Sequence, residues 1–195
     1  MKKTIFVAFI LAIVCLASCA DNTPKTATET VKTTATTAED AVKRGEYLVK
    51  ITGCNDCHSA KKMGPQGPEI IPETMLAGYP ADRPIRKFKD PSLKQGFAMF
   101  YPDLTAAAGP WGVSFAGNLT PDETGIGNWS EEQFKKALTQ GKYKGIDGGR
   151  MLLPPMPWVN YTTMADADVK AIYAYLKSIK PVKNLVPQPI TPDKM

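Results

Sequence analysis

Apolar side chains recur every three to four residues in three stretches of the chain, which is the spacing of one face of an α-helix. This spacing predicts helices over residues 39–53, 131–141 and 165–179. A Ser-Glu-Glu-Gln capping box opens the second helix and a glycine ends it, whereas Pro181 stops the third. The positions that carry the pattern are Ala41, Val42, Tyr47, Leu48, Ile51, Phe134, Leu138, Val169, Ile172, Tyr173 and Leu176.

The first predicted helix has an N-terminal cap and an internal glycine. Thr37 or Asp40 can accept hydrogen bonds from the free amides at its start. Gly45 lies inside the helix, where glycine costs about 1 kcal/mol relative to alanine. A glycine retained at that cost indicates close packing against another element.

The long middle of the chain has a different pattern. Residues 61–128 are rich in Gly and Pro and show no sustained period of either two or 3.6 residues. We interpret them as long loops and predict no strands. The expected fold is therefore all-α, with few helices and long Gly/Pro-rich connections.

The N-terminus has the composition of an export signal. A start with two lysines is followed by an apolar run over residues 5–16, which is too short for a permanent membrane anchor. The run ends in Leu-Ala-Ser-Cys at residues 16–19, which resembles a bacterial lipobox. We therefore predict a lipoprotein signal peptide over residues 1–18, lipidation at Cys19, and anchoring at the periplasmic side of a bacterial membrane. The alternative is an ordinary export signal with Cys19 incidental.

The composition divides the rest of the chain into three parts. Residues 19–37 are dominated by Thr, Lys and Ala and cannot bury enough apolar surface to fold, so we predict a flexible tether. Such a coil has a typical reach of about 20–25 Å. Residues 38–182 suffice for one folded domain, and residues 183–195 are proline-rich and predicted to be extended.

The strongest chemical signal is the sequence C-N-D-C-H at residues 54–58, which contains the only histidine of the chain. This is the attachment sequence of a c-type haem, with thioether bonds to Cys54 and Cys57 and with His58 as an axial ligand of the iron. A thioredoxin-like dithiol would need a βαβ setting, and a closed zinc site would need four ligands. The sequence supports these two alternatives less well than haem attachment. It therefore predicts one covalent haem c.

The identity of the second axial ligand separates an electron carrier from a catalyst. Since no second histidine exists, the candidates are methionine, a weaker donor or an open position. We name residues 150–158 the methionine loop, because Met151 and Met156 lie there and prolines flank Met156. We predict Met156 as the distal ligand, with Met151 as its rival. If Met156 only fills core space, the iron is left open.

Several sequence elements resemble the cytochrome c family. These are Gly-x-Tyr-Leu before the attachment sequence, a methionine between prolines, and a final Ala-Ile-Tyr-Ala-Tyr-Leu helix. The stretch over residues 117–129 and the Leu-Ala-Gly at residues 76–78 are similar to electron-accepting cytochrome c subunits of bacterial periplasmic dehydrogenases. The resemblance implies a cytochrome c fold around one haem. It also implies that the Trp129 indole binds a haem propionate, unless Trp129 is a plain core residue. Asn118 and Thr120 are separate candidates for polar contacts at the same place.

The charge balance adds only a weak constraint. The chain has 24 basic and 19 acidic residues, a mild excess that argues against nucleic acid as the main partner. The basic cluster Arg83, Arg86, Lys87 and Lys89 either guides an acidic redox partner or is a solvated loop.

The leading function is one-electron transfer by a membrane-tethered monohaem cytochrome c that is not itself an enzyme. The first alternative is an electron-accepting subunit of a periplasmic dehydrogenase complex. The second is a haem enzyme or ligand sensor with an open sixth site. The predicted partners are redox proteins, either a periplasmic dehydrogenase or a membrane respiratory complex.

Overall fold

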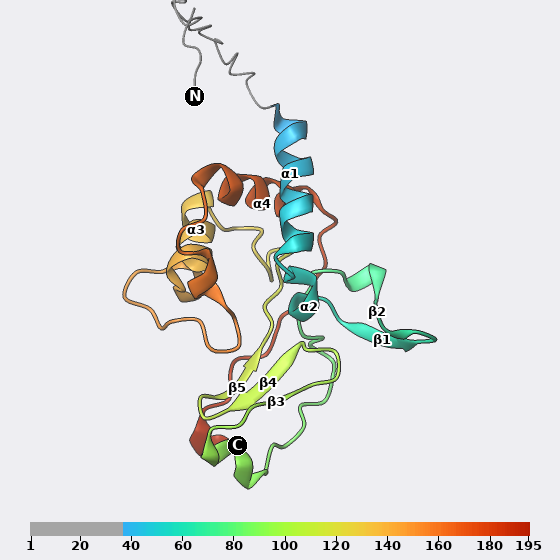
Figure 1. Cartoon of the computed structure of the whole chain (residues 1–195), viewed down its shortest axis with the longest axis vertical. Helices are drawn as coiled ribbons and strands as arrows, with labels where there is room; N and C mark the ends of the chain where they lie inside the picture. Colours follow the sequence, from blue (N-terminus) through green and yellow to red (C-terminus); the bar gives the residue numbers. More distant parts are fainter. Residues whose placement is uncertain (1–36) are drawn as a thin grey trace, which may run out of the picture. The chain divides into compact units, whose positions relative to one another are not determined.

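The computed structural model describes residues 37–195, so the predicted signal peptide, Cys19 and nearly all of the tether lie outside the described residues. The α-helices are α1 (Ala38–Ile51), α2 (Cys54–His58), α3 (Glu131–Gln140) and α4 (Asp166–Ser178) (Figure 1). Short 3-10 helices are η1 (Pro72–Thr74), η2 (Pro91–Gln95), η3 (Tyr143–Gly145), η4 (Trp158–Tyr161) and η5 (Pro192–Lys194). Within the described part of the chain, no helix is both long and apolar enough to cross a bilayer.

The three helices predicted from the apolar period are confirmed, and local signals set their ends. A capping box at the start of α1 pairs Thr37 with Asp40, whose amide donates to the Thr37 hydroxyl at 3.1 Å. In α3 the box pairs Ser130 with Gln133, and Gly141 ends the helix in the left-handed region at φ 66°. These contacts satisfy backbone groups that a helix end would otherwise leave without partners.

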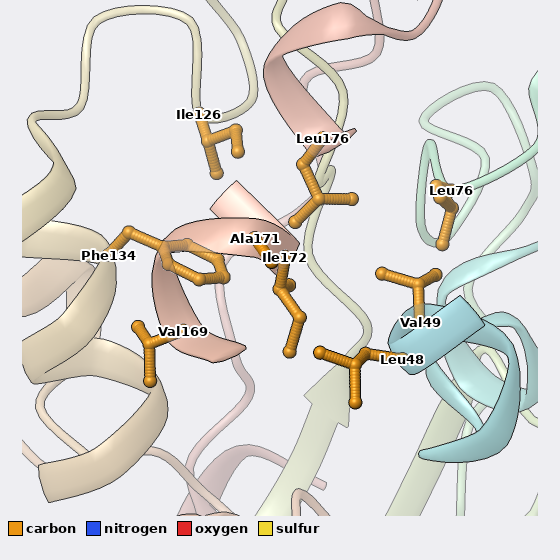
Figure 2. Packing of buried hydrophobic residues seen from close by; sticks show 9 residues of the cluster. All are labelled: Leu48, Val49, Leu76, Ile126, Phe134, Val169, Ala171, Ile172 and Leu176. Atoms are coloured by element: carbon orange, nitrogen blue, oxygen red, sulfur yellow. The ribbon is translucent and has the colours of Figure 1, made fainter. Parts of the chain in front are cut away.

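The main core lies where α1 meets α4. An alanine Cβ built at Gly45 would lie 2.6 Å from the carbonyl carbon of Ala171 and 2.7 Å from the Cβ of Tyr175. The predicted close approach at Gly45 is therefore confirmed. Figure 2 shows the buried side chains that α1, α3, α4 and two connecting segments contribute to this core. They are Leu48, Val49, Leu76, Ile126, Phe134, Val169, Ala171, Ile172 and Leu176.

The prediction of a strandless, all-α domain is wrong. Residues 61–70 form an antiparallel hairpin, and residues 99–115 form an antiparallel sheet with strand order β3-β4-β5 (Figure 1). The strands are β1 (Lys61–Gly64), β2 (Gly67–Ile70), β3 (Met99–Phe100), β4 (Ala106–Gly109) and β5 (Gly112–Phe115).

The sequence pattern does not reveal these strands, for a physical reason. None exceeds four residues, and β4 reads Ala-Ala-Ala-Gly, a sequence with no intrinsic strand preference. All of β4 is buried, so it lacks the alternation of apolar and polar residues that marks a half-exposed strand. Cross-strand hydrogen bonds and burial, which are tertiary effects, hold these residues in the sheet.

The C-terminal segment packs on the domain. The amide of Val113 in β5 donates to the carbonyl of Ile190 at 2.8 Å, and the amide of Ile190 donates back at 3.0 Å. The Asn184 side chain donates to the carbonyls of Ala77 at 2.7 Å and Tyr79 at 2.9 Å. The segment therefore joins the sheet to the loop that follows β2.

Candidate haem site

The helix α2 carries the attachment sequence as a single turn directly after α1. Gly53 takes a left-handed conformation at φ 71°, which ends the helical path of α1 before α2 begins. Cys54 and Cys57 are free thiols and are half-buried, and His58 ends the helix. Residues three and four apart share one side of a helical turn, so all three side chains are available to one group.

The ring of His58 is held by a backbone carbonyl. Its Nδ1 lies 2.7 Å from the carbonyl oxygen of Gly117, 59 residues further along the chain. A carbonyl oxygen only accepts, so Nδ1 carries the proton and donates it. The unprotonated Nε2 is then the nitrogen that can bind a metal. Burial lowers the pKa of His58 against the opposing effect of this hydrogen bond, which keeps the imidazole neutral.

Two loop segments enclose His58 from the side of its backbone. Gly78 donates its amide to the carbonyl of His58 at 2.8 Å, and a left-handed φ of 79° makes glycine necessary there. The buried hydroxyl of Ser59 accepts from the amide of Leu76 at 2.8 Å, and the amide of Leu119 donates to the carbonyl of Leu76 at 2.8 Å. The Leu-Ala-Gly element at residues 76–78 and the stretch that begins at residue 117 are therefore hydrogen-bonded to each other and to the segment of His58.

The thiols of Cys54 and Cys57 are less acidic than that of a solvent-exposed cysteine. Burial raises the pKa of Cys54, and burial together with the neighbouring Asp56 carboxylate raises the pKa of Cys57. Within residues 37–195, no group of three or more His, Cys, Asp or Glu side chains is arranged to hold a metal ion. The zinc alternative therefore finds no further ligand in the described part of the chain.

The backbone is tied to the rest of the site on both sides of Met156. The hydroxyl of Ser114 in β5 donates to the carbonyl of Pro154 at 2.6 Å. Beyond the loop, the hydroxyl of Tyr161 donates to the carbonyl of Thr52 at 3.2 Å, two residues before Cys54. The half-buried Met156 lies between these two anchoring points.

Met151 has a different environment. It forms an isolated bridge with Lys142, and 44% of its surface is exposed. Its backbone neighbour Leu152 donates to the carbonyl of Gly141 at 2.6 Å, which ties this end of the loop to α3.

Trp129 packs half-buried against the main core, just before α3. Its carbonyl accepts a hydrogen bond from the Tyr173 hydroxyl at 2.7 Å. The indole N–H makes no hydrogen bond to any of residues 37–195. Both the core role and a polar contact through the indole are therefore compatible with its position.

Asn118 is buried and lies in a network unconnected with the histidine side chain. Its amide nitrogen donates to Val182 O at 2.9 Å and to the Thr124 hydroxyl at 3.2 Å. Its amide oxygen accepts from the amide and hydroxyl of Thr120 at 2.9 and 2.8 Å. Asn118 thus fastens the C-terminal segment to the turn after Gly117, and its hydrogen-bonding groups already have protein partners. The haem contact stays a prediction.

The basic cluster predicted from the sequence is split by the structure. Arg83 pairs with the buried carboxylate of Asp103 at 2.7 Å and lines a surface cleft of about 400 Å³. Arg86, Lys87 and Lys89 are exposed. Only these last three can act as free surface cations.

Four contributors to the site escaped the sequence analysis. Gly117 was noted only as part of a motif, although its carbonyl orients His58. Ser114 and Tyr161 anchor the methionine loop. Lys61 donates to the backbone of α2. Each of the four contacts involves a backbone carbonyl oxygen. Every residue has such a carbonyl, so the pattern of residue types does not show which one will be used.

The residues present fit a covalently attached haem. Two half-buried thiols and a neutral imidazole with a free Nε2 share one helical turn. Half-buried apolar side chains flank the same core beside Cys54, namely Met75, Leu119, Trp129 and Met164. Thiols, one imidazole and apolar walls are the donor set and surroundings of a c-type haem.

A fold of this kind with such a site defines a c-type cytochrome domain. The family model described as Cytochrome c matches residues 42–180 of the chain. The chain belongs to the cytochrome c family.

Several relatives of this chain are cytochrome subunits of dehydrogenases. The gluconate 2-dehydrogenase cytochrome c subunit of Pantoea cypripedii is 34% identical over 148 residues, which cover 74% of this chain and 25% of that protein. The fructose dehydrogenase cytochrome subunit of Gluconobacter japonicus is 30% identical over 155 residues, covering 78% and 24%. The cytochrome c subunit of the quinone alcohol dehydrogenase of Gluconobacter oxydans is 30% identical over 146 residues, covering 74% and 23%. The chain spans about a quarter of the length of these relatives.

Proposed function

We propose that this protein transfers single electrons through one haem c, bound to Cys54 and Cys57 and ligated by His58 and Met156. The hydrogen bond from His58 Nδ1 to the Gly117 carbonyl carries the proposal, because it prepares Nε2 as a ligand and fixes the plane of the ring. The haem supplies a reversible change between ferric and ferrous iron.

The protein side chains would set the properties of that iron. The Gly117 carbonyl makes the His58 imidazole a stronger donor. A neutral thioether from Met156 favours the ferrous state and raises the reduction potential. If His58 and Met156 both bound the iron, no open position would be left for a substrate, and the haem would serve electron transfer alone.

The two backbone ties on either side of Met156 favour Met156 over Met151 as the ligand. Ser114 and Tyr161 hold the backbone on both sides of Met156, and the Tyr161 bond reaches the residues next to Cys54. Met151 lies in a bridge on the side of η3 and is exposed. A ligand needs a fixed backbone and a side chain that is not left in solvent, and the half-buried Met156 between two backbone ties meets both conditions.

Optical spectra of the haem-loaded protein test this ligand set. We expect the weak long-wavelength charge-transfer band of iron–methionine ligation in the ferric state, with its loss in Met156→Ala and its retention in the matched control Met151→Ala. The reverse pattern would make Met151 the ligand. A wild-type ferrous haem that binds carbon monoxide readily would instead favour an open-site enzyme or sensor.

A second candidate function is that of an electron-accepting subunit of a dehydrogenase. The named relatives are such subunits, and the match to them extends over three quarters of this chain. Purification from membranes in mild detergent distinguishes the two. A stable complex with a dehydrogenase would identify a subunit, whereas a free cytochrome that exchanges electrons with several partners would identify a shuttle.

The anchoring of the protein is part of the same proposal. A lipid on Cys19 and a tether over residues 19–37 would hold the domain at the periplasmic side of a bacterial membrane. Mass spectrometry of the mature N-terminus tests this directly. We expect an acylated Cys19, and Cys19→Ala should release the haem protein from the membrane fraction.

Trp129 completes the proposed site. Its half-buried indole lies beside the same core as Cys54, and its N–H is available to a haem propionate. Trp129→Phe retains the ring and removes the donor, so it should shift the reduction potential with little loss of stability.

A further inference from the structure

The ammonium group of Lys61 donates hydrogen bonds to several backbone carbonyls beside the attachment sequence. Its ammonium lies 2.7 Å from Asp56 O and 3.3 Å from Asn55 O, the two residues between the cysteines. It also lies 3.1 Å from Ser59 O and 3.0 Å from Asp103 O. An ammonium has three protons, so it is fully engaged by these four acceptors.

These contacts stabilise α2, which is too short to be stable through its own hydrogen bonds. A single turn such as α2 forms almost no internal hydrogen bonds, and its last carbonyls carry partial negative charge. A lysine ammonium at this end both satisfies the carbonyls and complements that charge. Lys61 therefore fixes the backbone from which the two cysteines and His58 project.

The same ammonium links the attachment helix to the three-stranded sheet. Asp103 lies in the turn between β3 and β4, and its buried carboxylate binds Arg83 at 2.7 Å and the Thr105 hydroxyl at 2.9 Å. That turn is itself rigidly held, so its carbonyl is a fixed acceptor for Lys61. The bond spans 42 residues of sequence.

We propose that Lys61 is a positioning residue that also raises the reduction potential of the haem. This proposal rests on the proposed function. Ferric iron carries one more positive charge than ferrous iron, and a fixed cation next to the attachment sequence disfavours the ferric form. Half-burial of Lys61 reduces the screening of this charge by water and salt.

The chain contains a matched control in the next residue. Lys62 is also in β1 and has the same charge, but it is exposed and makes no side-chain hydrogen bond or ion pair with any of residues 37–195. Comparison of Lys61→Met with Lys62→Met therefore separates a bound ammonium from a general surface charge. Lys61→Arg retains the charge and changes the geometry of the donors.

The experiment is a spectroelectrochemical titration of the haem-loaded variants at low and high salt, with thermal unfolding measured in parallel. At a fixed poise, we expect Lys61→Met to reduce the ratio of ferrous to ferric protein by about threefold or more at both salt concentrations. Lys62→Met should change the ratio of ferrous to ferric protein by a factor less than half as large, and this change should vanish at high salt. Lys61→Arg should keep the wild-type ratio even where its melting temperature falls.

Two results would overturn the proposal. If Lys61→Met melts earlier but keeps the wild-type ratio, the role of Lys61 is only structural. If Lys62→Met matches Lys61→Met, the effect is one of net charge. Should Lys61→Met fail to accumulate with haem, Lys61→Gln retains a donor without the charge and gives the same comparison. Failure of the proposed function would appear separately, as a wild-type haem that binds carbon monoxide, whereas the Lys61 shift remains measurable in either case.

Discussion

Replacement of Gly45 by alanine would separate α1 from α4 at their closest point. The new methyl group would overlap the carbonyl oxygen of Ala171 and lie 2.6 Å from its carbonyl carbon, whereas ordinary contact begins at 3.4 Å. The obstacle is helix backbone, which cannot move aside as a flexible side chain can. The two helices must therefore move apart by about 1 Å, which loosens the core around Leu48 and Ile172.

Two opposing effects decide the change in the free energy of unfolding. Alanine is favoured over glycine inside a helix by about 1 kcal/mol. Overpacking costs about 1–3 kcal/mol in ordinary cores and more where backbone is displaced. We expect the steric effect to dominate, with a net destabilisation of about 2 kcal/mol. For a domain of this size, that corresponds to a fall in melting temperature of roughly 4–8 °C.

Thermal and denaturant unfolding of the haem-loaded protein, followed by circular dichroism, measures this change. Gly149→Ala is the control, because its Cβ would meet no atom closer than 3.3 Å and its φ is not left-handed. The control should stay within about 0.5 kcal/mol of wild type. A Gly45→Ala protein that is as stable as wild type, or more stable, would refute the close helix contact.

Three further changes test other parts of the structure. Ser114→Ala removes the donor to the Pro154 carbonyl of the methionine loop, so it should cost about 0.5–1.5 kcal/mol in unfolding free energy and weaken the ferric charge-transfer band. An unchanged band would mean that this bond does not position the ligand. Arg83→Met leaves the Asp103 carboxylate buried without its cation and should cost about 2–3 kcal/mol in urea unfolding, whereas Arg86→Met should cost almost nothing. The pKa of Asp147 is lowered to about 2 by hydrogen bonds from two lysines, so its stabilising effect is present above its ordinary pKa of 3.8 and is lost as the pH falls towards 2. Asp147→Asn should flatten stability in that pH window, and an unchanged acid titration would contradict the pairing.

Much of the α-helical fold could be predicted from the sequence. The starts of α1 and α3 follow from capping boxes within four residues, and the end of α3 follows from a single glycine. The attachment sequence is equally local, because its two cysteines and its histidine lie within five consecutive residues. Gly45 predicted a close contact correctly, although the sequence could not name α4 as the partner.

The strands and the support of the site could not be predicted in this way. The buried β4 has a composition without strand preference and is held by neighbours that only the fold supplies. Nothing in the sequence indicates that the Asn118 amide binds the carbonyls of Val182 and Asn184, more than sixty residues further along the chain. A residue type shows what a side chain can donate or accept, but it does not show which distant backbone will meet it.

The sequence by itself determined the cofactor chemistry and the helices, because covalent attachment and helix formation depend on residues a few positions apart. Only the tertiary structure decided which nitrogen of His58 is free, how the methionine loop is tied, and what Lys61 binds. Each of these depends on carbonyl groups brought close by folding, 59 residues away for Gly117 and His58 and 109 residues away for Thr52 and Tyr161. The local sequence thus specifies the proposed ligands, and long-range backbone contacts hold the segments that carry them.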